Sequence, residues 1–134
     1  MLEPSVLELR LVVTTDDFEN ALRFYRDSLG MPELPAVASA GARVAILDAG
    51  RATLELADPK TADFIDEVEV GNRVAGPIRV ALEVKDTAGM TKRLVLAGAK
   101  VLGEPKTTPF HSINTRLEGP AGLQLTLFQR KPEV

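Results

Sequence analysis

The sequence offers carboxylates, but almost no histidine or cysteine, for acid–base or metal chemistry. The chain has one histidine, His111, and no cysteine, so disulfides and thiolate metal sites are excluded. Ser112 directly follows His111, so the sequence does not indicate a Ser-His-Asp catalytic triad. Glu55 is the most suggestive carboxylate, because it stands between Leu54 and Leu56 and should point to the opposite side of a strand. Such a carboxylate could act as a base, contact a ligand or pair with a cation.

A strand that runs directly into a helix is the first element that positions these residues. Residues 7–13 alternate apolar and polar side chains, which is typical of a strand with two different faces. Helical spacing follows, and Asp16 with Glu19 three residues later predicts the start of the helix. Gly30 suits its left-handed end.

A second copy of the same unit begins at Ile78. Residues 78–84 alternate in the same way, and a helix is predicted from Asp86 to Gly98. Each copy is followed by two more strand-like runs, at 43–48, 52–57, 114–118 and 123–128. The repeat predicts two β-α-β-β-β-like halves, which is a statement about fold and not about chemistry.

The connections between these runs are predicted from turn-forming residues. Residues 58–77 should link the halves and hold a short helix at 62–68, whose acids are interpreted as a solvent-exposed face. Loops or turns are predicted at 31–42, 48–50, 103–112 and 119–122, with a frayed tail at 131–134.

The composition limits the classes of partner. The chain has 134 residues, 45% of them hydrophobic, and a formal net charge of −3. Its cations are scattered among acids, which argues against nucleic acid as a main partner. No apolar run approaches the ~18 residues of a membrane span, and no secretory signal is visible in residues 1–10. We expect a cytoplasmic protein that pairs its small halves in a homodimer to bury more apolar surface.

Three stretches resemble a known family. They are Asp-Phe-Glu-Asn-Ala-Leu-Arg-Phe-Tyr with Leu-Gly-Met at 17–31, Thr-Leu-Glu-Leu at 53–56, and Leu-Glu-Gly-Pro-Ala-Gly-Leu-Gln-Leu at 117–125. They are similar to the modules of the vicinal oxygen chelate superfamily, which includes glyoxalase I, bleomycin-binding proteins, methylmalonyl-CoA epimerase and extradiol dioxygenases. The resemblance implies an α+β fold in which two βαβββ modules form curled mixed sheets around a cavity. The single domain, 1–134, would comprise module one at about 5–58, a linker at about 59–76 and module two at about 77–130.

The resemblance also implies where a metal would bind. Metal-dependent members use inward-facing His and Glu side chains on the first and last strands of each module, and the matching positions here are Arg10, Glu55, Arg79 and Thr126. A small shift in register would place Glu8 at the first position. Arginine stays protonated and offers no lone pair to a metal, so we expect that the usual site is lost and that no cofactor is held.

The same resemblance and strand alternation predict a polar cavity. Its expected ligand-binding residues are Arg10, Glu55, Arg79, Arg116, Gln124, Thr126, Phe128 and His111. Arginine would suit a ligand with an anionic group. The alternative for Arg10 or Arg79 is a structural ion pair with Glu55.

Three functions remain open at this point. The first is a small-molecule binding protein without a tightly bound metal. The second is a metal-dependent lyase, isomerase or dioxygenase of the same superfamily with Glu55 as its catalytic residue, for which Glu55, His111 and Glu83 are the only ordinary ligands available. The third is an interaction module whose cavity is closed by its own side chains.

Overall fold

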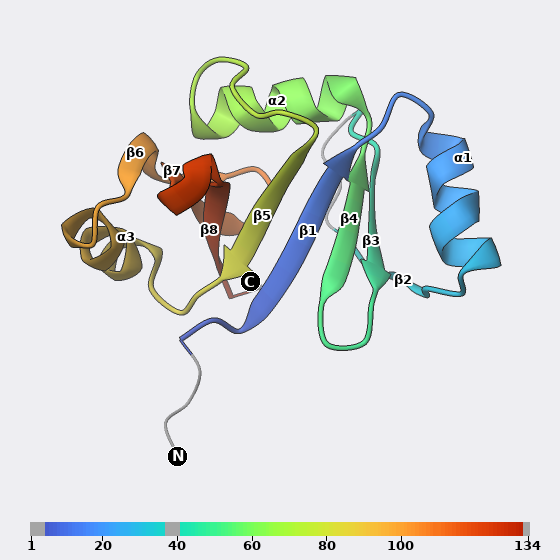
Figure 1. The fold of residues 1–134 in the computed structure, drawn as a ribbon, viewed down its shortest axis with the longest axis horizontal. Helices are drawn as coiled ribbons and strands as arrows, with labels where there is room; N and C mark the ends of the chain where they lie inside the picture. The colour runs from blue at the N-terminus through green and yellow to red at the C-terminus, as the bar shows by residue number, and fades with distance from the viewer. Residues whose placement is uncertain (1–4, 37–40, 133–134) are drawn as a thin grey trace.

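The protein forms one curled, unclosed eight-stranded sheet with helices on both faces (Figure 1). The computed structural model describes residues 5–36 and 41–132. Its strands are β1 (Glu8–Thr14), β2 (Glu33–Leu34), β3 (Val44–Asp48), β4 (Thr53–Ala57), β5 (Ile78–Glu83), β6 (Lys100–Thr108), β7 (Ser112–Glu118) and β8 (Gln124–Arg130). Its helical segments are α1 (Phe18–Leu22), η1 (Arg23–Ser28), α2 (Pro59–Glu69), α3 (Thr87–Leu96) and η2 (Pro120–Gly122). The predicted α+β fold of two repeated halves is confirmed.

The two halves join edge to edge at the centre of the sheet. The strand order is β2-β3-β4-β1-β5-β8-β7-β6, and β1 pairs antiparallel with β5 between the halves. Within each half the first strand pairs in parallel with the last, β1 with β4 and β5 with β8. The position of a residue on β1 or β5 therefore places it at the middle of the whole molecule.

The sheet has an outer face and an inner face. The outer face of the first half packs under α1, in a core of Phe18, Leu22, Ala45, Leu47, Leu54 and Leu56. The outer face of the second half packs under α3, in a core around Val84, Leu117 and Leu127. The inner face has its own small cluster, Val12, Ala81 and Phe128, and α2 lies across one end of it (Figure 1). Alternation along each strand thus separates the core from the face that could hold a ligand.

The first helix departs from the expectation at its start. Asp17, and not Asp16, caps it, because its Oδ1 accepts a hydrogen bond from the Asn20 backbone N–H at 3.1 Å. The helix then passes into the π-helix η1, and Gly30 ends it with a φ of +85° as predicted. In the second half Asp86 is the cap as predicted, accepting from Gly89 N–H at 3.0 Å.

The prediction of a loop at 103–112 was wrong for 103–108, which are strand, whereas residues 109–111 do form a turn. Strand β6 runs through Thr108, and its pairing with β7 shifts register on both sides of Gly103. Because β6 is an edge strand, it tolerates irregular pairing and Pro105. Both features give the segment the sequence pattern of a loop. The short strand β2 was missed as well, inside the loop predicted for 31–42, of which 37–40 lie outside the described residues.

The interpretation of the linker acids as a solvent-exposed face was wrong for Asp66. The helix itself is confirmed and is longer than predicted, and Asp63 and Glu67 are exposed on it. Asp66 and Glu69, however, are only 1% and 3% exposed. They lie three residues apart on the helix face that also carries Ile65, and that face is turned toward the sheet. In the described residues no helix is long and apolar enough to span a membrane.

Candidate functional site

A cavity of about 470 Å³ lies on the inner face. Its volume is within the range of small-molecule sites, about 300–1,000 Å³. Its apolar lining residues are Pro35, Ala36, Val44, Ile46, Ile65, Ala81, Phe110 and Phe128. Its polar and charged lining residues are Arg10, Glu55, Glu69, Arg79, His111, Ser112, Asn114, Thr126, Arg130 and Lys131. The expectation of a cavity closed by its own side chains is therefore not met.

The first half of the inner face holds a loose group of charges. The Arg10 guanidinium donates to Glu8 and, through Nη1 at 3.4 Å, to Glu55 Oε1. The predicted ion pair of Arg10 with Glu55 is confirmed, but Glu8 is the nearer partner. Burial alone would raise the pKa of Glu8, but hydrogen bonds from Arg10 and Thr53 outweigh it and lower that pKa below its ordinary value. Arg10 is therefore compensated even without Glu55.

The second half holds a closed group built around Arg116. Its guanidinium is fully buried and donates to Asp66 Oδ1 at 2.8 Å and to Glu69 Oε1 at 3.0 Å. Glu69 also accepts from Thr126 and Asn114, each at 2.8 Å. Arg116 is sealed inside this charge-assisted network, so an outside ligand cannot reach its guanidinium.

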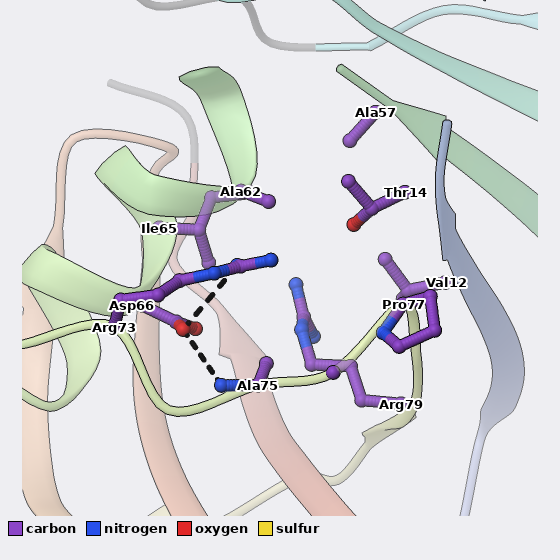
Figure 2. Close-up of a pocket in the computed structure, with 11 residues that line it drawn as sticks. Val12, Thr14, Ala57, Ala62, Ile65, Asp66, Arg73, Ala75, Pro77 and Arg79 are labelled. Carbon is purple, nitrogen blue, oxygen red and sulfur yellow. Dashed lines mark hydrogen bonds and ion pairs between the residues drawn. The ribbon is translucent and has the colours of Figure 1, made fainter. Parts of the chain in front are cut away.

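Asp66 is the most strongly held carboxylate of this closed group. Its burial raises its pKa, but backbone N–H donors from Ala75 and Val74, both at 2.8 Å, and the Arg116 guanidinium bring that pKa below its ordinary value. Figure 2 shows Asp66 bound to the linker backbone at Ala75 beside the Arg73 side chain. The linker that follows α2 is therefore tied to the same network.

Arg79 stands between the two groups and joins the closed one through Thr126, whose hydroxyl donates to Glu69 at 2.8 Å. It projects from the central strand β5 and is 7% exposed. Its single hydrogen bond runs from Nη1 to the neutral hydroxyl of Thr126 at 2.9 Å, and within the described residues no carboxylate lies in ion-pair range of it. Arg79 lines the large cavity and also a small one of about 10 Å³, into which Figure 2 shows it pointing together with Arg73.

The eight predicted ligand-binding residues divide into two sets. Six line the large cavity: Arg10, Glu55, Arg79, Thr126, Phe128 and His111. Arg116 and Gln124 do not, because each is bound into the closed group, where Arg116 Nη1 donates to Gln124 Oε1 at 3.0 Å. His111 lies exposed on the β6–β7 turn at the cavity mouth, with a positive φ of 60°.

The contribution of α2 to the cavity was not predicted from the sequence. Glu69 and Ile65 line the cavity from the helix, and Phe110 of the β6–β7 turn meets Phe64 of the same helix at 5.9 Å between ring centres. One signal was available, since Asp66 and Glu69 share the helical face of Ala62 and Ile65. Nothing in the sequence indicated which face of the sheet that helix would cover.

Comparison with known proteins decides the family. The family model for the Glyoxalase/Bleomycin resistance protein/Dioxygenase superfamily matches residues 9–127. The chain belongs to this superfamily. None of the curated proteins compared matches the chain significantly.

Several solved structures are similar to this protein over nearly its whole chain. Methylmalonyl-CoA epimerase from Mycobacterium tuberculosis matches with a TM-score of 0.70 at 23% identity, covering 98% of this chain and 94% of that one. A hypothetical protein from Bacillus halodurans C-125 gives 0.68 at 19%, covering 93% and 94%. A structure named NAD-dependent benzaldehyde dehydrogenase from Legionella pneumophila gives 0.66 at 11%, covering 92% and 99%. At these identities the likeness shows the fold alone.

The glyoxalase superfamily's metal site does not fit the residues present. Two of the four matching positions, Arg10 and Arg79, carry guanidinium groups, which repel a divalent cation and offer it no lone pair. In the described residues no three His, Cys, Asp or Glu side chains are placed to hold a metal. The alternative set of Glu55, His111 and Glu83 therefore does not assemble, and Glu83 is instead paired with Arg130 at 3.0 Å.

Proposed function

We propose that this glyoxalase-superfamily protein binds a small organic anion in the inner cavity, with Arg79 receiving the negative group. The support is that the three arginines lining the cavity differ in their carboxylate partners. Arg10 and Arg130 each have carboxylates within 3.4 Å, whereas Arg79 has, among the described residues, a hydrogen bond to a threonine hydroxyl only. A buried charge without a counter-charge is costly, and a ligand carboxylate would supply that counter-charge with bidentate geometry.

The rest of the cavity wall suits an apolar body on that anion. Phe128, Ile46 and Ile65 line it from β8, β3 and α2, so a ligand would be covered from both the sheet and the helix. Arg10 lies over the Phe128 ring at 4.9 Å, which fixes that ring as one wall. A carboxylic acid with an aromatic or branched aliphatic chain matches these surfaces.

The experiment is calorimetric titration with 3-phenylpropionate and 4-methylpentanoate, each beside its uncharged amide. We expect the acids to bind and the amides to bind more weakly, and Arg79→Gln to weaken acid binding about 10- to 100-fold, as loss of a charge-assisted hydrogen bond does. Arg26→Gln is the control, because Arg26 pairs with Asp27 and Glu33 on the surface. Equal affinities in wild type and Arg79→Gln would reject the proposal.

We further propose that the site works without a tightly bound metal. After dialysis against Zn²⁺, Ni²⁺ or Fe²⁺, elemental analysis should find well under one ion per chain, since one carboxylate is too small a ligand set. Stoichiometric metal that disappears in Glu55→Ala would contradict this and would favour the metal-dependent alternative.

We also propose a homodimer formed through the outer face of β1 and β5. The helices α1 and α3 leave this central strip uncovered, and its apolar side chains Leu7, Leu9, Leu11 and Ile78 are 38–55% exposed. Two antiparallel strands present a nearly two-fold symmetric surface, which a second copy can match to itself. Sedimentation should show a species of twice 14.4 kDa that Leu9→Lys dissociates and Leu96→Lys, on the 89% exposed tip of α3, leaves intact. A monomer in wild type would count against it.

A further inference from the structure

Four inner-face residues form one row across the middle of the sheet. Val12 on β1 is the direct partner of Glu55 on β4 and of Arg79 on β5, and Ile46 on β3 is the direct partner of Glu55. Direct partners on neighbouring strands point to the same face, and Glu55, Arg79 and Ile46 all line the large cavity. The row therefore reads apolar, acidic, apolar, basic from β3 to β5.

The carboxylate and the guanidinium of this row do not meet. Neighbouring strands lie about 4.8 Å apart, so the backbones of Glu55 and Arg79 are separated by roughly 10 Å with Val12 between them. In the described part of the chain the two make no ion pair; Glu55 contacts Arg10, and Arg79 contacts Thr126. The two opposite charges therefore stay apart, while Val12 between them packs with Ala81 and Phe128 and is 3% exposed.

Both charged groups have capacity to spare. A carboxylate has about four acceptor positions, yet Glu55, 9% exposed, has one contact of 3.4 Å. Arg79 uses one of its five N–H donors. The sealed side-chain atoms without a partner in the described residues are Asn114 Oδ1 and Arg116 Nη2, so the unused atoms of Glu55 and Arg79 open on the cavity.

We propose that the cavity takes a zwitterion of the amino-acid class, whose carboxylate binds Arg79 and whose ammonium binds Glu55. This rests on the anion site proposed above and adds the cationic end of the ligand. A simple anion would compensate Arg79 but would press its apolar body against the free lone pairs of Glu55, which is unfavourable. An ammonium group supplies the donors that Glu55 lacks, and one zwitterion can reach both charged groups from the cavity that they line together.

The same row orients the ligand side chain. With the two charged ends fixed along Glu55 and Arg79, the side chain of the zwitterion faces the apolar wall of Ile46, Ile65 and Phe128. A branched aliphatic or aromatic amino acid is therefore the class expected, and a polar one is disfavoured because burying its side chain unpaired costs free energy.

The experiment titrates the full chain with L-phenylalanine, 3-phenylpropionate, which lacks the ammonium, and L-phenylalaninamide, which lacks the carboxylate. L-leucine with 4-methylpentanoate repeats the comparison for a branched chain. At pH 7 we expect each amino acid to bind about 10-fold or more tightly than its desamino analogue. Glu55→Gln should abolish that preference, whereas Arg79→Gln should weaken the binding of both the amino acids and their desamino analogues.

The outcomes separate the two proposals. If the desamino acids bind as tightly as the amino acids in wild type and still depend on Arg79, the zwitterion is wrong and the anion site stands. If no acid binds, or Arg79→Gln changes nothing, both are wrong. The wild-type comparison is decisive by itself should Glu55→Gln fail to fold, which thermal unfolding would reveal.

Discussion

The two halves of the inner face carry the same kinds of charged residue in opposite states. In the second half Arg116 is fully buried and meets the two buried carboxylates of α2, Asp66 and Glu69, at 2.8 and 3.0 Å. In the first half the contact between Arg10 and Glu55 is 3.4 Å long, and both side chains reach the cavity. The difference comes from the linker helix, which brings acids to one half and leaves the other uncovered. A fold built from a repeat thus becomes asymmetric through the segment between the copies.

Close approach of α2 to β6 makes the closed half possible. A Cβ built on Gly103 would lie 1.8 Å from the backbone oxygen of Glu69, so only glycine allows the helix end to come this near. The register shifts of β6 around the same residue bend the edge strand beneath the helix. The charged network and the backbone contact therefore support the same docking.

Removal of Arg116 tests the closed half most severely. Arg116→Met should lower the free energy of unfolding by about 3–5 kcal/mol, because Asp66 and Glu69 would stay buried without their cation. Urea unfolding measures it. Arg130→Met is the matched variant, since Arg130 also contacts two carboxylates but is 55% exposed, and its cost should stay below about 1 kcal/mol. An equal loss of stability in both variants would show that burial of the Arg116 network makes no difference to its contribution.

Substitution of Gly103 tests the docking without touching a charge. Gly103→Ala should cost about 1–3 kcal/mol, because the new methyl group must push α2 away from β6. Gly76→Ala is the control, since a Cβ there meets nothing within 4 Å and the residue has no positive φ. If both variants unfold at the same urea concentration, the close approach of α2 to β6 does not contribute to the stability of the closed half.

The sequence was sufficient for the elements that follow a regular period. Alternation over 7–13 and 78–84 placed the central strands, and strand alternation with the family resemblance placed Arg10, Glu55 and Arg79 on one face. Periodicity reports which residues share a face, and that information is local. The confirmed pair of Arg10 and Glu55 follows from it.

The wrong predictions around α2 have a non-local cause. The face of the sheet that α2 covers depends on contacts of Asp66 and Glu69 with strands some 50 residues away, which no local pattern encodes. Acids on a short helix are usually solvated, so burial of these two was unexpected. Their partner Arg116 was for the same reason assigned to ligand binding, although it is buried against the acids of α2 and does not line the large cavity.

Acid unfolding separates the sealed acids from the exposed ones. The pKa of Asp66 is lowered from 3.8 in the folded state, so its stabilisation is present above about pH 4 and is lost as the pH falls further. Wild type should lose stability between about pH 5 and pH 2, and Asp66→Asn should show a flatter dependence over that range. Asp63→Asn, on the exposed side of α2, should retain the wild-type slope; the same flattening in both would mean that the sealed position of Asp66 is irrelevant.

The smallest effect is expected at the open half, in a double-mutant cycle on Arg10 and Glu55. Glu55→Ala alone leaves Arg10 paired with Glu8, so no buried guanidinium is left uncompensated and the large penalty of a broken buried pair does not arise. The long 3.4 Å contact should give a coupling free energy of about 0.5–1 kcal/mol in urea unfolding. A coupling near the 3–5 kcal/mol expected for Arg116 would show that Glu55 is committed to Arg10 and unavailable to a ligand. A coupling of zero would show that the pair contributes nothing to folding and that both side chains are free to face the cavity.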